Sequence, residues 1–89
     1  MEQRVLIIDE RDNVAVALED IPAGTEILLP DGRKIRSVSD IPYSHKVSLA
    51  ALSAGDTVMK YGEAIGRAAA DIEMGEWVHS HNLEPMEEM

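Results

Sequence analysis

The segment His79-Ser80-His81-Asn82 concentrates side chains that can bind a metal ion or carry a proton. In an extended strand alternate side chains point to one face, so we expect His79 and His81 to project together, about 7 Å apart. Two imidazoles at this spacing can hold one metal ion or grip one carboxylate. The alternative is a strand end with two exposed histidines that have no role. A pair of histidines alone does not decide between these interpretations.

Two other short segments carry groups that can transfer protons or hold an anion. His45 and Lys46 follow a loop and precede apolar sequence, and Lys60 and Tyr61 follow an apolar run. Lysine and tyrosine serve in proton transfer when burial tunes their pKa. Taken singly, each is more commonly a surface lysine or a core tyrosine. Trp77 is interpreted as a core or interface anchor.

The composition limits the partners of such a site. The chain has 89 residues, eight basic and seventeen acidic, for a net charge of −9, and it has no cysteine. Disulfides, thiolate metal sites and a cysteine nucleophile are therefore excluded. The one basic cluster, residues 33–36, is too short for nucleic-acid binding. The longest uncharged stretch, residues 47–55, falls far below the roughly 20 apolar residues of a membrane span, and no signal-peptide pattern is seen. We expect one cytoplasmic domain.

The hydrophobic residues make a core that is poor in aromatic side chains. Phenylalanine is absent and tryptophan occurs once. A chain of this size buries only about 60% of its unfolded surface, so it is marginally stable alone. We expect part of its stability to come from a partner surface, which could include a second copy of the chain.

Short strands and turns must position these groups. Residues 5–8 form an apolar run, which predicts a strand buried on both faces. Residues 14–18 alternate between larger and smaller apolar side chains, as half-buried strands do. The dipeptide Asp31-Gly32 between two apolar runs predicts a hairpin, with positive φ available to both residues.

Three segments are harder to assign. Residues 63–70 are rich in alanine, which favours a helix, but Gly62 just before them and Gly66 within them oppose it, so helix and strand are equally favoured by propensity. Leu49 and Leu52 could share a short helical turn. Residues 84–89 form an acidic tail with nothing to bury, and we expect it to fray.

A short repeat organises the chain. Residues 20–27 and 71–78 share the pattern Asp-Ile-x-x-Gly-x-x-Ile/Val, and residues 51–58 match it with leucine for isoleucine and without the aspartate. In each unit an aliphatic anchor, a glycine in a turn and a β-branched residue follow in order. Three such units predict bent strands and turns around a compact core.

Taken in order, the quoted residues resemble a known family. They form the string His45-Lys46-Val47-x-Leu49, Gly55-Asp56-x-Val58-x-Lys60-Tyr61-Gly62, Ile65-Gly66 and Gly75-x-x-Val78-His79-x-His81-Asn82. This string resembles the small subunit, or N-terminal domain, of the altronate/galactarate dehydratase family, a branch of the SAF superfamily, over roughly residues 14–82. The resemblance implies a mostly β domain of β-clip fold over residues 1–83, with at most one or two short helical turns. It also implies a strand at residues 65–70.

The resemblance implies an activity as well. Family members eliminate water from sugar acids such as altronate or galactarate to give 2-keto-3-deoxy acids, using a divalent metal, commonly iron or manganese. A larger partner, fused or separate, holds most of the active site. The related (2R)-sulfolactate sulfo-lyase uses a similar small subunit to expel sulfite. We therefore expect a small subunit or N-terminal domain that is inactive alone and shares its metal with a large catalytic subunit.

The chemistry of dehydration suggests where each residue acts. Removing a proton next to a carboxylate builds an enediolate, which needs a cation, and expelling the hydroxyl group needs an acid. The expected catalytic groups are His45, Lys46, Lys60 and Tyr61; the expected substrate-binding residues are Asn82, Gly62 and Glu63; and the expected metal ligands are His79 and His81. We expect Asn82 to orient the two histidines.

Two alternatives stay open: a non-catalytic SAF module that binds a small ligand or a protein, and an interaction domain without a ligand. Histidines more than about 12 Å apart would favour the binding module, because metal–ligand bonds of ~2 Å could not join them. The net charge of −9 bears on substrate binding, because an acidic domain repels an anionic substrate. We therefore expect a locally cationic face turned toward the partner.

Overall fold

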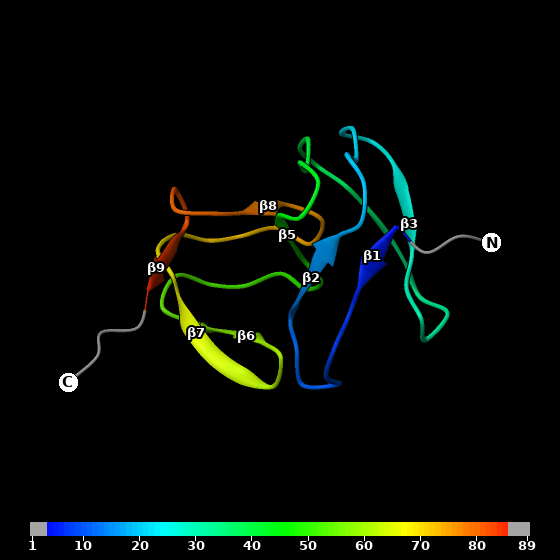
Figure 1. Cartoon of the computed structure of the whole chain (residues 1–89). Helices are drawn as coiled ribbons and strands as arrows, with labels where there is room; N and C mark the ends of the chain where they lie inside the picture. Colours follow the sequence, from blue (N-terminus) through cyan, green and yellow to red (C-terminus); the bar gives the residue numbers. More distant parts are fainter. Residues whose placement is uncertain (1–3, 86–89) are drawn as a thin grey trace.

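The computed structural model describes residues 4–85, which form nine short strands and contain no helix (Figure 1). The strands are β1 (Val5–Leu6), β2 (Val14–Ala17), β3 (Glu26–Leu28), β4 (Lys34–Arg36), β5 (Lys46–Ser48), β6 (Thr57–Lys60), β7 (Glu63–Ala68), β8 (Trp77–Val78) and β9 (Leu83–Pro85). They make a central sheet in the order β1-β2-β5-β8, the hairpin β3-β4 and a third sheet in the order β6-β7-β9. The prediction of a mostly β domain is confirmed.

The central sheet has a hydrophobic cluster on each face. Antiparallel pairing sets Ala15 opposite Val47, and both belong to the larger cluster, which also includes Ile27 of β3 and Ile35 of β4. Val14 and Val78 project to the other face and pack with Val58 of β6 in the smaller cluster. Because neighbouring residues of a strand point to opposite faces, one residue of slippage would exchange the two cores.

The repeated turns number four within the described residues, one more than the sequence pattern predicted. The fourth unit, residues 40–47, carries the aspartate and isoleucine, but Ser44 stands where the others have glycine, and its φ is 69°. The absence of glycine hid this unit in the sequence. The anchors pair as isolated bridges, Ile21 with Ile41 and Leu52 with Ile72. Leu52 therefore joins an extended bridge, and the helical turn expected near Leu49 does not form.

Aspartates join the paired turns. The Oδ1 atom of Asp20 accepts the backbone N–H of Tyr43 at 2.8 Å, and Oδ1 of Asp40 accepts that of Ala23 at 2.8 Å. In the second pair, Oδ1 of Asp71 accepts the N–H of Ala54 at 2.9 Å. Each bond satisfies a backbone donor that the turn leaves unpaired.

Two hairpins differ in how they turn. The hairpin at Asp31-Gly32 is present, but only Gly32 has positive φ, 92°, so the expectation for Asp31 was wrong. The turn is instead a tight one with Gly32 N–H donating to the Leu29 carbonyl at 3.0 Å. Between β6 and β7, Tyr61 and Gly62 both have positive φ, 56° and 74°, which is typical of a two-residue hairpin turn.

Other parts of the sequence prediction need correction. The strand expected at residues 5–8 is only Val5–Leu6, and as an edge strand it leaves Leu6 39% exposed. The strand that the resemblance implied at residues 65–70 is present, but it covers residues 63–68 and ends before Ala69. Strand β9 includes Glu84 and Pro85, which were assigned to the acidic tail; the rest of that predicted tail, residues 86–89, lies outside the described residues. No helix able to cross a membrane occurs between residues 4 and 85.

Candidate functional site

The histidines predicted to be functional meet at one end of the central sheet. Lys46 of β5 pairs with Val78 of β8, so the same antiparallel register sets His45 opposite His79, one residue further on. Their ring centroids are 4.8 Å apart. By alternation these two rings share a face with Trp77, while Lys46 points to the opposite face.

Trp77 is the centre of this group. Its ring stacks on His79 at 5.3 Å with 7° between the planes, and its centroid lies 5.1 Å from His81 and 5.5 Å from His45. We call His45, Trp77, His79 and His81 the histidine cluster. From the sequence Trp77 was expected to be a core or interface anchor, and its place at the centre of the histidines was not predicted, although the closeness of Trp77, His79 and His81 in the chain was a signal that their rings could meet.

His79 and His81 were expected to lie on an extended strand, and they do not. Strand β8 ends at Val78, and residues 79–82 form a turn that leads to β9. The turn, not strand alternation, brings His81 back to Trp77. All three histidines contact the ring of Trp77, so they lie closer together than the roughly 12 Å beyond which one metal ion could not join them.

Asn82 holds this turn together. It is 4% exposed, and its Oδ1 accepts the backbone N–H of His79 at 2.9 Å. Its Nδ2 donates to the Trp77 carbonyl at 2.9 Å and to Oε2 of Glu76 at 3.1 Å. Both amide hydrogens are thus used within the protein. The geometry fits the expected orienting role, and it leaves no Nδ2 hydrogen for a substrate.

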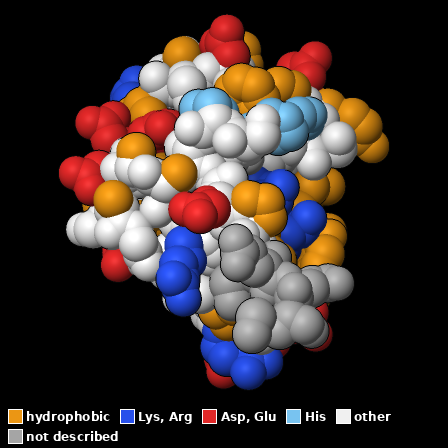
Figure 2. All heavy atoms as spheres, turned by 90° about the vertical axis from the view of Figure 1, so that its left-hand side faces the viewer, with side chains coloured by type: hydrophobic (Ala, Val, Ile, Leu, Met, Phe, Trp, Pro, Cys, Tyr) orange, Lys and Arg blue, Asp and Glu red, His pale blue; other side chains and the backbone are white. Residues whose placement is uncertain are grey.

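Lys46 and Lys60 form a second feature, the lysine pair. Burial lowers the pKa of Lys46, and the charge of Lys60 lowers it further. The four ion pairs within residues 4–85 occupy Arg4, Arg11, Arg33 and Lys34, so neither lysine of the pair is neutralised by a carboxylate there. The positive charges of the two lysines therefore repel each other without a compensating carboxylate among residues 4–85, and an anion near them would be favourable. Figure 2 shows histidine side chains close to Lys and Arg side chains on one face of the molecule.

The β6–β7 turn positions Lys60. The Nζ atom of Lys60 lies 4.7 Å from the ring centroid of Tyr61, a residue that is 52% exposed. The N–H of Gly62 donates to Oδ1 of Asp12 at 2.8 Å, which fixes the turn against the segment between β1 and β2. Glu63, the cross-strand partner of Lys60, is exposed. The structure thus brings Lys60, Tyr61, Gly62 and Glu63 together in a turn separate from the histidine cluster.

The donor set of the histidine cluster suits a metal in part. Imidazole nitrogen is a good ligand for iron and other transition metals. Among residues 4–85, the rings of His79 and His81 make no hydrogen bond that would occupy them, and both side chains are exposed. The described residues contain no group of three or more histidine, aspartate or glutamate side chains able to hold a metal ion.

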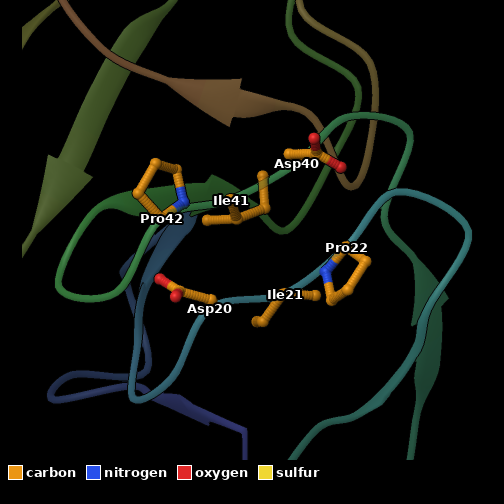
Figure 3. Close-up of a pocket in the computed structure, with 6 residues that line it drawn as sticks. All are labelled: Asp20, Ile21, Pro22, Asp40, Ile41 and Pro42. Carbon is orange, nitrogen blue, oxygen red and sulfur yellow. The ribbon is translucent and has the colours of Figure 1, made fainter.

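A hollow of about 340 Å³ lies elsewhere, between two of the repeated turns. Figure 3 shows the six residues that line it, which are Asp20, Ile21, Pro22, Asp40, Ile41 and Pro42. None of the predicted site residues lies among them. The aspartates each use one oxygen to bond the opposite turn, so the hollow follows from the turn pairing.

The fold and the site define a small β domain of paired aspartate turns with a histidine cluster at one sheet end. Over residues 3–86 the chain matches the altronate/galactarate dehydratase SAF domain, and it belongs to that family. The resemblance found in the sequence is therefore confirmed.

Three relatives match this chain over different shares of their own length. The altronate dehydratase of Escherichia coli is 45% identical over 71 residues, which are 80% of this chain and 14% of that enzyme. The (2R)-sulfolactate sulfo-lyase subunit alpha of Paracoccus pantotrophus is 53% identical over 49 residues, 55% of this chain and 73% of that subunit. The corresponding subunit of Chromohalobacter salexigens is 36% identical over 84 residues, 88% of this chain and 89% of the subunit. The chain thus spans a small part of the dehydratase and most of the sulfo-lyase subunit.

Proposed function

We propose that this domain is the small subunit, or N-terminal domain, of a metal-dependent sugar-acid dehydratase of the altronate/galactarate type, and that it acts with a large catalytic subunit. The observation that supports this most is the convergence of three histidines on Trp77 at one sheet end, in a chain of this family. A scaffold alone gives no reason for three ionisable rings to meet at a surface.

The lysine pair supports binding of an acidic substrate. The chain has a net charge of −9, which repels anions in general. Lys46 and Lys60 have no carboxylate partner among residues 4–85, so a substrate carboxylate would relieve their mutual repulsion. In this proposal the pair binds the carboxylate and lowers the cost of building negative charge next to it.

His79 and His81 would hold the metal together with ligands from the large subunit, because the described residues contain no group of three or more ligands able to hold it. A divalent iron or manganese ion would supply positive charge near the substrate. Asn82 keeps the two histidines in place through the backbone bond to His79.

A second candidate function is the small subunit of (2R)-sulfolactate sulfo-lyase. The relatives of that name match this chain over most of their own length, 73% and 89%. The two candidates share the same small domain and differ in the leaving group, hydroxide or sulfite. The choice between them depends on the pocket of the large subunit.

The test is to recover the tagged chain with its co-purifying partner and to assay the complex with ferrous iron. Altronate, galactarate and (2R)-sulfolactate serve as the panel of substrates. We expect formation of a 2-keto-3-deoxy acid, and His81→Ala should abolish it while the variant keeps its folded spectrum. Ser80→Ala, a neighbour on the same turn, is the matched control. Unchanged turnover with His81→Ala would remove that residue from the site.

A further inference from the structure

The three histidines differ in one respect, which is the bond made by His45. The indole Nε1–H of Trp77 donates to Nδ1 of His45 at 3.1 Å. Within residues 4–85 the rings of His79 and His81 make no hydrogen bond. Trp77 therefore donates a hydrogen bond to His45, whereas it contacts His79 and His81 only through the aromatic rings.

This bond fixes which nitrogen of His45 carries the proton. An indole N–H can only donate, so the Nδ1 that receives it must offer a lone pair. In the neutral imidazole the proton then resides on Nε2, since the ring carries one N–H and one acceptor. A metal ion binds the unprotonated nitrogen, and that nitrogen of His45 is already occupied.

We infer that Trp77 is a positioning residue that holds His45 in its Nε2–H form, so that His45 meets an anionic ligand as a hydrogen-bond donor and not as a metal ligand. The anion is a carboxylate or an oxyanion, and its identity as a sugar acid rests on the proposed function. The histidines of the cluster then have different roles. His79 and His81 are free to bind a metal, and His45 donates a hydrogen bond from Nε2–H.

The register of the sheet supports this division. His45 lies directly opposite His79 with 4.8 Å between ring centroids, so a metal on His79 and an anion on His45 would be neighbours. His45 is half-buried, which limits the positions its ring can take, whereas His79 and His81 are exposed. A donor held in one orientation costs no reorganisation when charge develops beside it.

The tautomer can be measured without any activity assay. In the full chain labelled with ¹⁵N-histidine, long-range ¹H–¹⁵N correlation spectra distinguish protonated from unprotonated ring nitrogens. We expect His45 to show an unprotonated Nδ1 and a protonated Nε2. Trp77→Phe keeps an aromatic ring but removes the N–H, and it should convert the His45 pattern to a mixture of tautomers. A protonated Nδ1 in the unmodified chain, or an unchanged pattern in Trp77→Phe, would overturn the inference.

A second experiment addresses the role in the assembled enzyme. Glutamine imitates the neutral ring, because its Oε1 can accept from Trp77 while its Nε2 donates. His45→Gln should therefore keep the bound metal and lose less kcat/KM than His45→Leu, which should lose about ten- to a hundredfold, the contribution of one bond to a charged group. Loss of metal in His45→Gln would contradict the division of roles. If the complex acts on none of the sugar acids, the proposed function fails, and the NMR result still decides the tautomer.

Discussion

The backbone N–H of His79 donates to Oδ1 of Asn82 at 2.9 Å, so a buried amide fixes the start of the turn that carries the two exposed histidines. The same side chain also bonds the Trp77 carbonyl and Glu76. Asn82→Ala removes all three bonds and should lower the free energy of unfolding by about 2–3 kcal/mol. Urea denaturation of the full chain measures this difference.

Asn82→Asp provides the matched control. It keeps the acceptor for His79 but sets a carboxylate against the Glu76 carboxylate and the Trp77 carbonyl. It should destabilise the chain at neutral pH, and the loss should diminish in acid, where the new carboxyl group gains a proton and can donate. Equal stability of both variants and the unmodified chain would show that the turn does not depend on Asn82.

The lowered pKa of Lys46 predicts that removing its charge stabilises the folded chain to a degree that depends on pH. Burial and Lys60 lower the folded-state pKa of Lys46 below its usual 10.5, so between the two pKa values the unfolded chain binds more protons than the folded one. The contribution of Lys46 to stability therefore rises with pH through that window, and its charged form costs stability below it. Lys46→Met should be more stable than the unmodified chain at neutral pH, by a margin that shrinks at alkaline pH.

The control for this effect is Lys60→Met, which removes the neighbouring charge and should bring the pKa of Lys46 closer to its usual value. Thermal unfolding at a series of pH values gives the margin for each variant. A margin that does not vary with pH would reflect packing of the methionine alone and would contradict the assignment.

Two glycines at the same place in the repeated turns predict different tolerance to alanine. Gly55 and Gly75 have φ of 92° and 87°, a conformation that costs an alanine about 1 kcal/mol or more. A Cβ at Gly55 meets open space, whereas one at Gly75 would collide with the backbone oxygen of Arg36. Gly75→Ala should cost about 1–3 kcal/mol more than Gly55→Ala, because backbone must move. Chemical denaturation of both variants measures the difference. Equal losses of unfolding free energy would mean that the backbone at Arg36 can move away from the new Cβ at no cost.

The sequence allowed a mostly β domain, the strand at residues 14–17 and the Asp31-Gly32 hairpin to be predicted, because these follow from local alternation and turn chemistry. It could not show that Trp77 unites the histidines. That contact depends on the β5–β8 register, which sets His45 opposite His79 across 34 positions of the chain. The fourth turn was missed for a different reason: Ser44 adopts a positive φ that a pattern keyed to glycine does not detect.

The incomplete symmetry of the second turn pair gives the last prediction. In the first pair each aspartate accepts the N–H of the residue three positions into the opposite turn, at Tyr43 and Ala23. In the second pair Asp71 does so for Ala54, but the reciprocal position is Ala51, which has no acceptor for Met74. Within residues 4–85 the N–H of Met74 has no other partner.

Ala51→Asn supplies the missing oxygen without adding charge to an acidic chain, and it should raise the free energy of unfolding by about 0.5–1.5 kcal/mol, the net contribution of one hydrogen bond. Ala51→Asp should give the same bond with a smaller gain at low salt, because the chain already carries a net charge of −9. Ala51→Val, which cannot accept, is the control. If asparagine and valine stabilise equally, the gain comes from the backbone or from packing, and the pairing rule inferred from Asp20, Asp40 and Asp71 does not extend to this turn.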